Sequence, residues 1–332
     1  MTSPHLLPVE ILLQIATYLP PQVQLSLLHA QASLATLFTN HHLLCRDPRG
    51  NTVLHLLAAQ CDSADHITTQ LIPRESINVD IPNNSGDTPL MQAACAGNET
   101  MARLLLDRTD VDPDHPNGRG ITPLWNAAAL GREAIVRLFL HHYVNLDATD
   151  SDCMSVLATA IEHGHESVAM LLLAEAENSG DLDASMEECR GRSPLSLAAE
   201  HGMAGVVEML LARDDVDVNA RDGGGMTPLL WATWLGKEAV ARVLLLQGPR
   251  VCVNVEDVFC RTPLSYAAAA GSEEIVRLLL EREDIDPEMV DENRCTPLYH
   301  AQDHKRTREL FVQRGLTRLT VEKEEASEGE DE

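Results

Sequence analysis

Three groups of neighbouring histidines are the residues of this sequence best suited to chemistry. They are His41-His42, His141-His142 and His163 with His165. Imidazole nitrogens often bind metals and act as general bases. However, the eight cysteines include no Cys-x-x-Cys pair, and the chain has no His-Glu-x-x-His, Gly-x-Ser-x-Gly or Gly-x-x-x-x-Gly-Lys-Ser/Thr sequence. The sequence therefore predicts no catalytic residue, cofactor or metal site, and the protein is not expected to be an enzyme.

Two other features have spacings that chemistry could use. The glycine run 223–225 could approach a phosphate, but no helix is placed to cradle one there. Acidic pairs such as Asp214-Asp215 are typical of solvated loops. A weaker alternative is a catalytic site grafted onto an extended loop near Asn178.

The charge of the chain excludes two classes of partner. The formal net charge is −26, whereas nucleic acids and anionic membranes require a basic surface. Part of the excess negative charge lies in the last residues of the sequence, since residues 321–332 carry seven acidic residues and one lysine. We expect residues 318–332 to form a disordered acidic tail. With no signal sequence, membrane span or disulfide pattern apparent, we expect an intracellular protein, cytoplasmic or nuclear.

The elements that position these residues repeat along the chain. Thr-Pro-Leu begins at Thr88, Thr122, Thr227, Thr262 and Thr296, with weaker copies at Thr52, Ser155 and Ser193. From Thr52 to Thr296 there are 244 residues in seven steps, or about 35 per step. Such a period predicts a stack of small units rather than one globular core.

Each recurring position has a physical reason. Threonine or serine caps a helix through its side-chain oxygen, and the following proline suits the first turn. Alanine five residues later lets helices approach closely, and glycine nine residues later permits the left-handed turn that ends the helix. A second helix then presents an aliphatic stripe, as in 133–140. One unit buries too little to fold alone, so the units must stack.

These units resemble ankyrin repeats, whose pattern reads Thr-Pro-Leu-His-x-Ala-Ala-x-x-Gly before a second helix. The match covers Cys45 to Gly315. It implies an all-α repeat solenoid of stacked helix-turn-helix units with β-hairpin loops, about eight of them in residues 45–317. The resemblance also gives the histidines a structural role, because ankyrin repeats often place histidine beside the central glycine. The fourth copy, at Ser155, is degenerate, and the surplus near Asn178–Asp181 predicts a protruding loop.

The segment before the array, residues 1–44, has a different pattern. Apolar residues at Leu7, Ile11, Ile15 and Leu19 share one helix face, and Leu7-Pro8-Val9-Glu10-Ile11 resembles the start of an F-box. That resemblance implies a small helical segment that binds a Skp-type adaptor of a cullin ubiquitin ligase through Leu7, Pro8, Ile11, Ile15 and Leu19. Gln24 and a missing tryptophan depart from the F-box pattern. The alternative is a helical cap for the first unit.

The resemblance to ankyrin repeats places target-binding residues on the concave face of the array. They are Trp125, Leu130, Arg192, Met226, Trp234, Leu235, Phe259 and Arg261. Trp234, Leu235, Met226 and Phe259 would form an apolar patch, although Trp234 could instead fold down as packing. Trp231 is assigned to packing, and Trp125 fits either role. We expect a monomeric, non-catalytic substrate receptor for a protein with apolar and basic residues. The alternative is a plain ankyrin scaffold.

Overall fold

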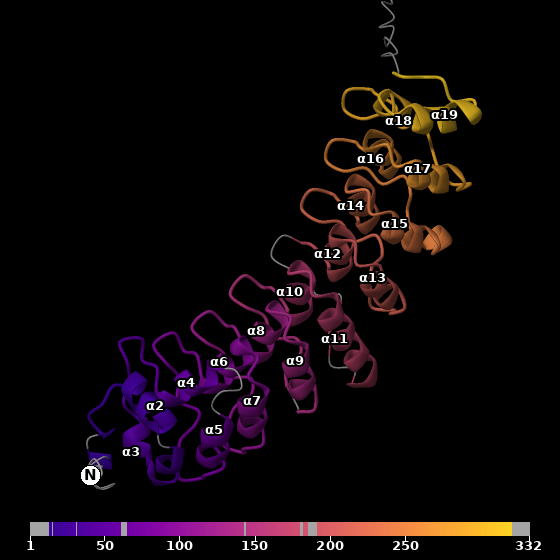
Figure 1. Cartoon of the computed structure of the whole chain (residues 1–332). Coiled ribbons are helices and arrows are strands. Elements are labelled where there is room, and N and C mark those ends of the chain that lie inside the picture. Colours follow the sequence, from indigo (N-terminus) through magenta and orange to yellow (C-terminus); the bar gives the residue numbers. More distant parts are fainter. Residues whose placement is uncertain are drawn as a thin grey trace, which may run out of the picture. The chain divides into compact units, whose positions relative to one another are not determined.

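The computed structural model describes residues 13–14, 16–30, 32–60, 65–142, 144–179, 182–184 and 191–320. The chain divides into two compact units, unit 1 (Met1–Leu182) and unit 2 (Asp183–Glu332), each taken here by itself (Figure 1). Each unit is a row of short helix pairs joined by projecting loops, and no strand occurs among the described residues. The predicted all-α solenoid is confirmed. None of the described helices is long and apolar enough to cross a membrane.

Unit 1 stacks its helices in two rows. It begins with α2 (Pro21–Ala30), η1 (Ala32–Leu37) and α3 (Asn40–Leu43). The pairs that follow are α4 (Val53–Ala58) with α5 (Asp65–Leu71), α6 (Pro89–Ala96) with α7 (Glu99–Leu106), α8 (Pro123–Ala129) with α9 (Glu133–Leu140), and α10 (Val156–Glu162) with α11 (Glu166–Ser179). The first helices pack on one another in order, as do the second helices. The loop expected at Asn178–Asp181 is partly helical, because α11 extends to Ser179; residues 180 and 181 lie outside the described residues.

Unit 2 repeats the arrangement. Its pairs are α12 (Pro194–His201) with α13 (Ala204–Leu211), α14 (Pro228–Trp234) with α15 (Glu238–Leu245), α16 (Pro263–Ala270) with α17 (Glu273–Leu280), and α18 (Pro297–His300) with α19 (Lys305–Gln313), with η2 (Gly248–Arg250) after α15. Residues 318–320, assigned above to the tail, return to α18: the Thr296 hydroxyl donates to the carbonyl of Arg318 at 2.7 Å. The rest of the predicted tail lies outside the described residues.

The recurring threonine or serine begins the first helices as predicted. The Thr88 hydroxyl accepts the backbone N–H of Met91 at 3.3 Å, and the same cap recurs at Thr122, Ser155, Ser193, Thr227 and Thr262. At the other end of α6, Gly97 has φ +78°, a left-handed conformation that a larger residue adopts only with strain. The caps thus fix both ends of a helix of two turns.

Leucine and alanine from successive repeats form the core. The leucine that follows the first-turn proline is at most 1% exposed in four repeats, at Leu90, Leu124, Leu229 and Leu264. The alanines five residues after the cap, such as Ala232, are fully buried between neighbouring first helices. Each leucine contributes about 2 kcal/mol by leaving water. Because this surface is buried only against the next repeat, stability depends on stacking.

Arginines after the second helices tie several repeats to the element before them, and we call each of these an arginine clamp. The guanidinium of Arg108 donates to the carbonyls of Ile72, Arg74 and Ile77 at 2.6, 2.8 and 2.9 Å. It also forms a two-point ion pair with Asp110. The same contact to preceding carbonyls is made by Arg74, Arg250 and Arg282. These charge-assisted hydrogen bonds satisfy carbonyls that the ends of the preceding helices leave free.

The loops between pairs are tight turns, which we call fingers, instead of the expected β-hairpins. Among the described residues, bridges occur only singly, at Thr149–Ser155 and Cys295–Thr320. An Asp or Asn five residues before the capping residue holds the turn, since its Oδ1 accepts the N–H groups two and four residues later. Asp222 does this for Gly224 and Met226, both at 2.9 Å. The others are Asp47, Asn83, Asn117, Asp150, Asp257 and Asp291.

One finger position requires a left-handed residue, which leads to a stability prediction. Two residues before the cap, glycine stands at Gly225 with φ +74°, but Cys260 has φ +56°. A side chain in this conformation costs about 1–2 kcal/mol, part of which the extra freedom of glycine in the unfolded chain offsets. We expect Cys260→Gly to raise the free energy of unfolding by about 0.5–1 kcal/mol in denaturant titrations. Cys252→Gly, at an exposed loop position without positive φ, is the control and should not stabilise.

His55 makes stability depend on pH. Its side chain is 2% exposed; Nε2 donates to the carbonyl of Asp87 at 2.9 Å, and Nδ1 accepts the N–H of Thr52 at 3.2 Å. Burial holds the pKa of His55 below its ordinary value of 6.5, although the bond to Asp87 opposes the shift. The unfolded chain therefore binds a proton near pH 6.5 while folded His55 stays neutral. Stability is complete above that pH and falls below it, by up to about 1.4 kcal/mol per pH unit until the folded pKa is reached.

The His55→Gln variant isolates this effect. Glutamine does not titrate, so the free energy of unfolding of the variant should fall less steeply below pH 6.5 than that of the wild type. Denaturant titrations at several pH values measure both curves. Two parallel curves would show that His55 does not carry the dependence. His42, whose pKa burial also lowers, remains in both proteins.

The described part of the N-terminal segment packs on the first repeat. Helix α2 contacts α4 and η1 contacts α5, with Leu28 and Phe38 fully buried. Arg74 of the first repeat donates to the carbonyl of Phe38 at 2.7 Å. Of the predicted adaptor-binding residues, Leu19 is partly exposed. The others, Leu7, Pro8, Ile11 and Ile15, lie outside the described residues.

Candidate functional site

Large apolar side chains gather on the first helices and fingers of unit 2. Trp234 at the end of α14 is 48% exposed, Leu235 is 41% exposed, and Phe259 on the next finger is 49% exposed. We call the group of Trp231, Trp234, Leu235, Phe259, Arg261 and Tyr266 the aromatic surface. Exposed aromatic side chains of this kind mark interaction sites more often than scattered aliphatic ones do.

Ring contacts join Trp231, Trp234 and Tyr266, and Arg261 lies between Tyr266 and Phe259. The ring centres of Trp231 and Trp234 are 5.3 Å apart and tilted by 45°, and those of Trp234 and Tyr266 are 6.1 Å apart at 43°. The guanidinium carbon of Arg261 lies 5.8 Å from the ring centre of Phe259 and 5.7 Å from that of Tyr266. Both distances are within the range of cation–π attraction. Trp234 therefore stands on a packed layer rather than alone.

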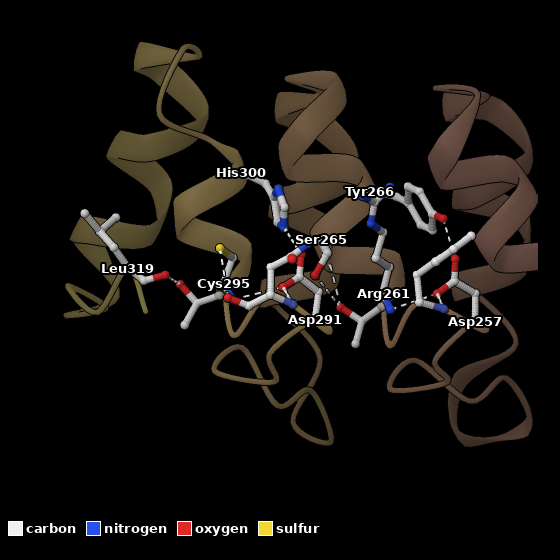
Figure 2. A network of polar contacts seen from close by, with 12 residues as sticks. Asp257, Arg261, Ser265, Tyr266, Asp291, Cys295, His300 and Leu319 are labelled. Carbon is white, nitrogen blue, oxygen red and sulfur yellow. Dashed lines mark hydrogen bonds and ion pairs between the residues drawn. The ribbon is translucent and has the colours of Figure 1, made fainter. Parts of the chain in front are cut away.

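Finger carboxylates hold three of the first-helix side chains in place. In each case the second oxygen of the finger aspartate accepts from a side chain nine residues later. Figure 2 shows two of these pairs, Asp257 with Tyr266 and Asp291 with His300. Asp222 Oδ2 accepts from the indole N–H of Trp231 at 3.0 Å, and Asp257 accepts from the hydroxyl of Tyr266. The third pair is Asp291 with His300 at 3.0 Å. Because each aspartate also closes its finger, these pairs join finger and helix into one rigid surface.

Tyr266 stays a hydrogen-bond donor under all physiological conditions. Burial, reinforced by the bond to Asp257, raises the pKa of Tyr266 from 10.0 to about 12. The phenol is 9% exposed and packs with Met226 and Leu230 in a small buried cluster. A neutral, fixed phenol supports the neighbouring rings.

The structure brings only some of the predicted target-binding residues together. Trp234, Leu235, Phe259 and Arg261 lie together in the aromatic surface. Met226, expected to face outward, is instead only 7% exposed, because its side chain fills the cluster beneath Tyr266. Trp231 packs as predicted and is partly buried.

The other predicted residues do not join this group. Arg192 of unit 2 is paired with Glu200 at 2.8 Å. Trp125 and Leu130 belong to unit 1. The indole N–H of Trp125 donates to the carbonyl of Met154 at 2.9 Å, so this tryptophan links two repeats, while Leu130 is 48% exposed.

The histidines with metal-like spacing bond to the backbone. Their ring nitrogens lie 2.7–3.2 Å from carbonyl oxygens, in the pairs His42 with Leu13, His141 with Arg137, His163 with Thr159, and His165 with Ala129. His165 also lies against Gly131, where an added Cβ would meet its ring at 2.4 Å. This arrangement agrees with the structural role suggested by the resemblance.

Comparison with known families settles the architecture. The family model for ankyrin repeats (3 copies) matches residues 25–117, 108–184, 176–257 and 245–316. The chain belongs to the ankyrin repeat family. The first match begins at residue 25, so it includes most of α2. Ankyrin repeats are protein-interaction modules, and the array is accordingly an interaction scaffold.

Similar proteins share the ankyrin repeats over limited lengths. Neurogenic locus notch homolog protein 1 of Danio rerio is 31% identical over 108 residues, which is 32% of this chain and 4% of that protein. Ankyrin repeat and SAM domain-containing protein 3 of Homo sapiens is 38% identical over 60 residues, 18% of this chain and 9% of that protein. The crystal structure of the ankyrin repeat domain of Bcl-3 superposes with a TM-score of 0.56 at 25% identity, over 70% of this chain and 99% of that domain. The aligned parts are thus small fractions of both curated relatives.

Proposed function

We propose that the protein is a non-catalytic adaptor that holds a protein target on the aromatic surface of unit 2. The observation that carries the proposal is Trp234, a half-exposed tryptophan supported by Trp231 and Tyr266. Tryptophan in such a setting loses little side-chain freedom on binding and is a frequent hot spot. The bonds of Asp222 to Trp231 and of Asp257 to Tyr266 keep the surface preformed, which lowers the cost of association.

A comparison of two variants tests this proposal. We expect Trp234→Ala to weaken target capture by roughly 30-fold, equivalent to about 2 kcal/mol. The control is Leu246→Ala, a 78% exposed leucine directly after the second helix α15, which should leave capture unchanged. Proximity labelling in the native cell with the full chain compares the proteins recovered. Equal recovery of every protein with wild type and Trp234→Ala would refute the proposal.

As an extension, we propose that the adaptor is a substrate receptor, joined through its N-terminal segment to a Skp-type adaptor and a cullin inside the cell. The support is the F-box-like motif together with two exposed apolar residues beside it, Tyr18 at 90% and Val23 at 44%. The alternative, a plain scaffold, is supported by the packing of α2 on α4, which resembles a cap. A receptor needs the exposed side chains of this segment to bind an adaptor, whereas a scaffold needs only the buried side chains that pack on α4.

Substitution within the segment separates these roles better than truncation does. Tyr18→Asp with Val23→Asp changes exposed side chains and leaves the buried contacts of α2 intact. A receptor loses binding to purified Skp-type adaptor while its melting temperature stays unchanged. A plain scaffold binds no adaptor in either form, and deletion of residues 1–40 lowers its stability only.

A further inference from the structure

Arg261 is a half-buried cation that forms no ion pair with any carboxylate of the described residues. Its guanidinium lies over the rings of Phe259 and Tyr266, and its buried Nε has no hydrogen-bond partner in the described parts of the chain. No ion pair of Arg261 occurs within the described part of the chain. Three other shielded arginines, Arg108, Arg213 and Arg282, each pair with an aspartate at 2.6–2.7 Å. A half-buried guanidinium without such a counter-charge is costly.

The repeat register shows which carboxylate is missing. Arg192 occupies the same position as Arg261, directly before the residue that caps a first helix. Arg192 pairs with Glu200, seven residues after its capping serine, at 2.8 Å. Seven residues after Thr262 stands Ala269, which is exposed. The chain therefore supplies the arginine in both repeats but the carboxylate in only one.

We propose that the aromatic surface binds a protein segment with a carboxylate side chain beside a large apolar side chain, and that the carboxylate pairs with Arg261 as Glu200 does with Arg192. The apolar side chain packs against Trp234 and Phe259, which are about half exposed. This inference rests on the proposed function, since it names the chemistry of the target held at the same surface. The sequence predicts a partner with apolar and basic residues. Pairing with Arg261 adds one acidic group, at that contact.

Charge complementarity at Arg261 is local. A planar guanidinium offers parallel N–H donors to a carboxylate, and the flanking rings shield the pair from water. The net charge of −26 repels acidic partners at long range, but salt screens that field beyond about 8 Å. The segment therefore needs one carboxylate at the contact, within a partner that is otherwise neutral or basic.

Two variants and a peptide library test the inference. A random dodecapeptide library displayed on phage is selected on the full-length wild type. Enriched peptides are expected to combine Asp or Glu with an adjacent aromatic or large aliphatic residue. For each one, fluorescence anisotropy compares the peptide with its Glu→Gln or Asp→Asn form, and the wild type should prefer the carboxylate by about tenfold.

One variant removes the guanidinium of Arg261, and the other pairs it within the chain. Arg261→Met keeps the apolar stem over the rings, and Ala269→Glu supplies the missing carboxylate from within the chain at an exposed helix position that tolerates it. Both should reduce the carboxylate preference to less than about twofold. Ala269→Glu keeps Arg261 and the rings, so it tests the pairing even if Arg261→Met is poorly folded. Arg192→Met, which changes an already paired arginine, should leave the preference unchanged.

The outcomes distinguish this inference from the proposed function. Peptides that require Trp234 but bind equally well with an amide in place of the carboxylate would overturn the inference and leave the proposed function standing. A full carboxylate preference in Ala269→Glu would likewise overturn the inference alone. Enriched peptides that are insensitive to Trp234→Ala, or an absence of enrichment, would overturn both.

Discussion

Replacing Arg108 with methionine is expected to lower the free energy of unfolding of unit 1 by about 3–5 kcal/mol. Arg108 is a clamp whose side chain is 9% exposed, and it donates to three carbonyls of the preceding repeat. Methionine has a similar length but no donor, so the carbonyls of Ile72 and Ile77, both in fully buried residues, lose their partner. The loss lies between repeats, where stacking is the source of stability. Urea unfolding followed by circular dichroism measures it.

Two controls make the result specific. Arg137 also forms an ion pair, with Glu133, but its side chain is 55% exposed, and Arg137→Met should cost less than about 0.5 kcal/mol. Arg108→Lys keeps the charge and loses the planar fork, so an intermediate loss is expected. Equal effects for Arg108→Met and Arg137→Met would mean that the clamp contributes nothing beyond an ordinary surface pair.

Replacing Asp257 with alanine is expected to cost unit 2 about 3 kcal/mol. One oxygen of this 6% exposed carboxylate accepts the N–H groups of Phe259 and Arg261 at 2.8 and 2.9 Å, and the other accepts the Tyr266 hydroxyl. Alanine leaves all three donors without this acceptor. The finger that presents Phe259 and Arg261 is then free to open. In the variant, both the stability and the carboxylate preference of the aromatic surface should therefore decrease.

Asp257→Asn and a titration of Tyr266 test the mechanism of that loss. Asparagine keeps the oxygen that closes the finger, as Asn83 and Asn117 do in unit 1, so it should cost about 1 kcal/mol. In both variants the pKa of Tyr266 should fall from about 12 but stay above 10.0, because burial is the larger cause of its shift. Ultraviolet titration measures this change. An unchanged pKa would show that Asp257 does not bind the phenol in solution.

Local signals in the sequence predicted most of the fold. The Thr-Pro-Leu period located the first helices, because capping and the proline position are decided by neighbouring residues. The finger residues, such as Asp222, carry a nearly regular signal, since Asp or Asn stands five residues before every cap except Ser193, where Glu188 stands. That signal was missed because acidic residues in turns were assigned to solvated loops. The β-hairpins were wrongly expected, since an Asp or Asn side chain satisfies backbone groups that a strand partner would otherwise bind.

The candidate site was predictable in outline only. Trp234, Leu235 and Phe259 were expected on the binding face and are exposed in the structure. Met226 was expected there too, yet it is buried, because the direction of a side chain at the end of a finger depends on the packing of Tyr266 from the next repeat. Sequence spacing gives a position on a helix or turn but not which neighbour fills the space above it.

The sequence by itself determined the class of this protein: short capped helices with small and aliphatic faces that fold only by stacking. These properties arise from interactions a few residues apart, so they can be read along the chain. Only the tertiary structure showed that Arg192 pairs with Glu200 while Arg261 pairs with no carboxylate of the described residues, and that the finger aspartates bind Trp231 and Tyr266. Such pairings depend on distances between side chains of different elements, which folding alone brings together.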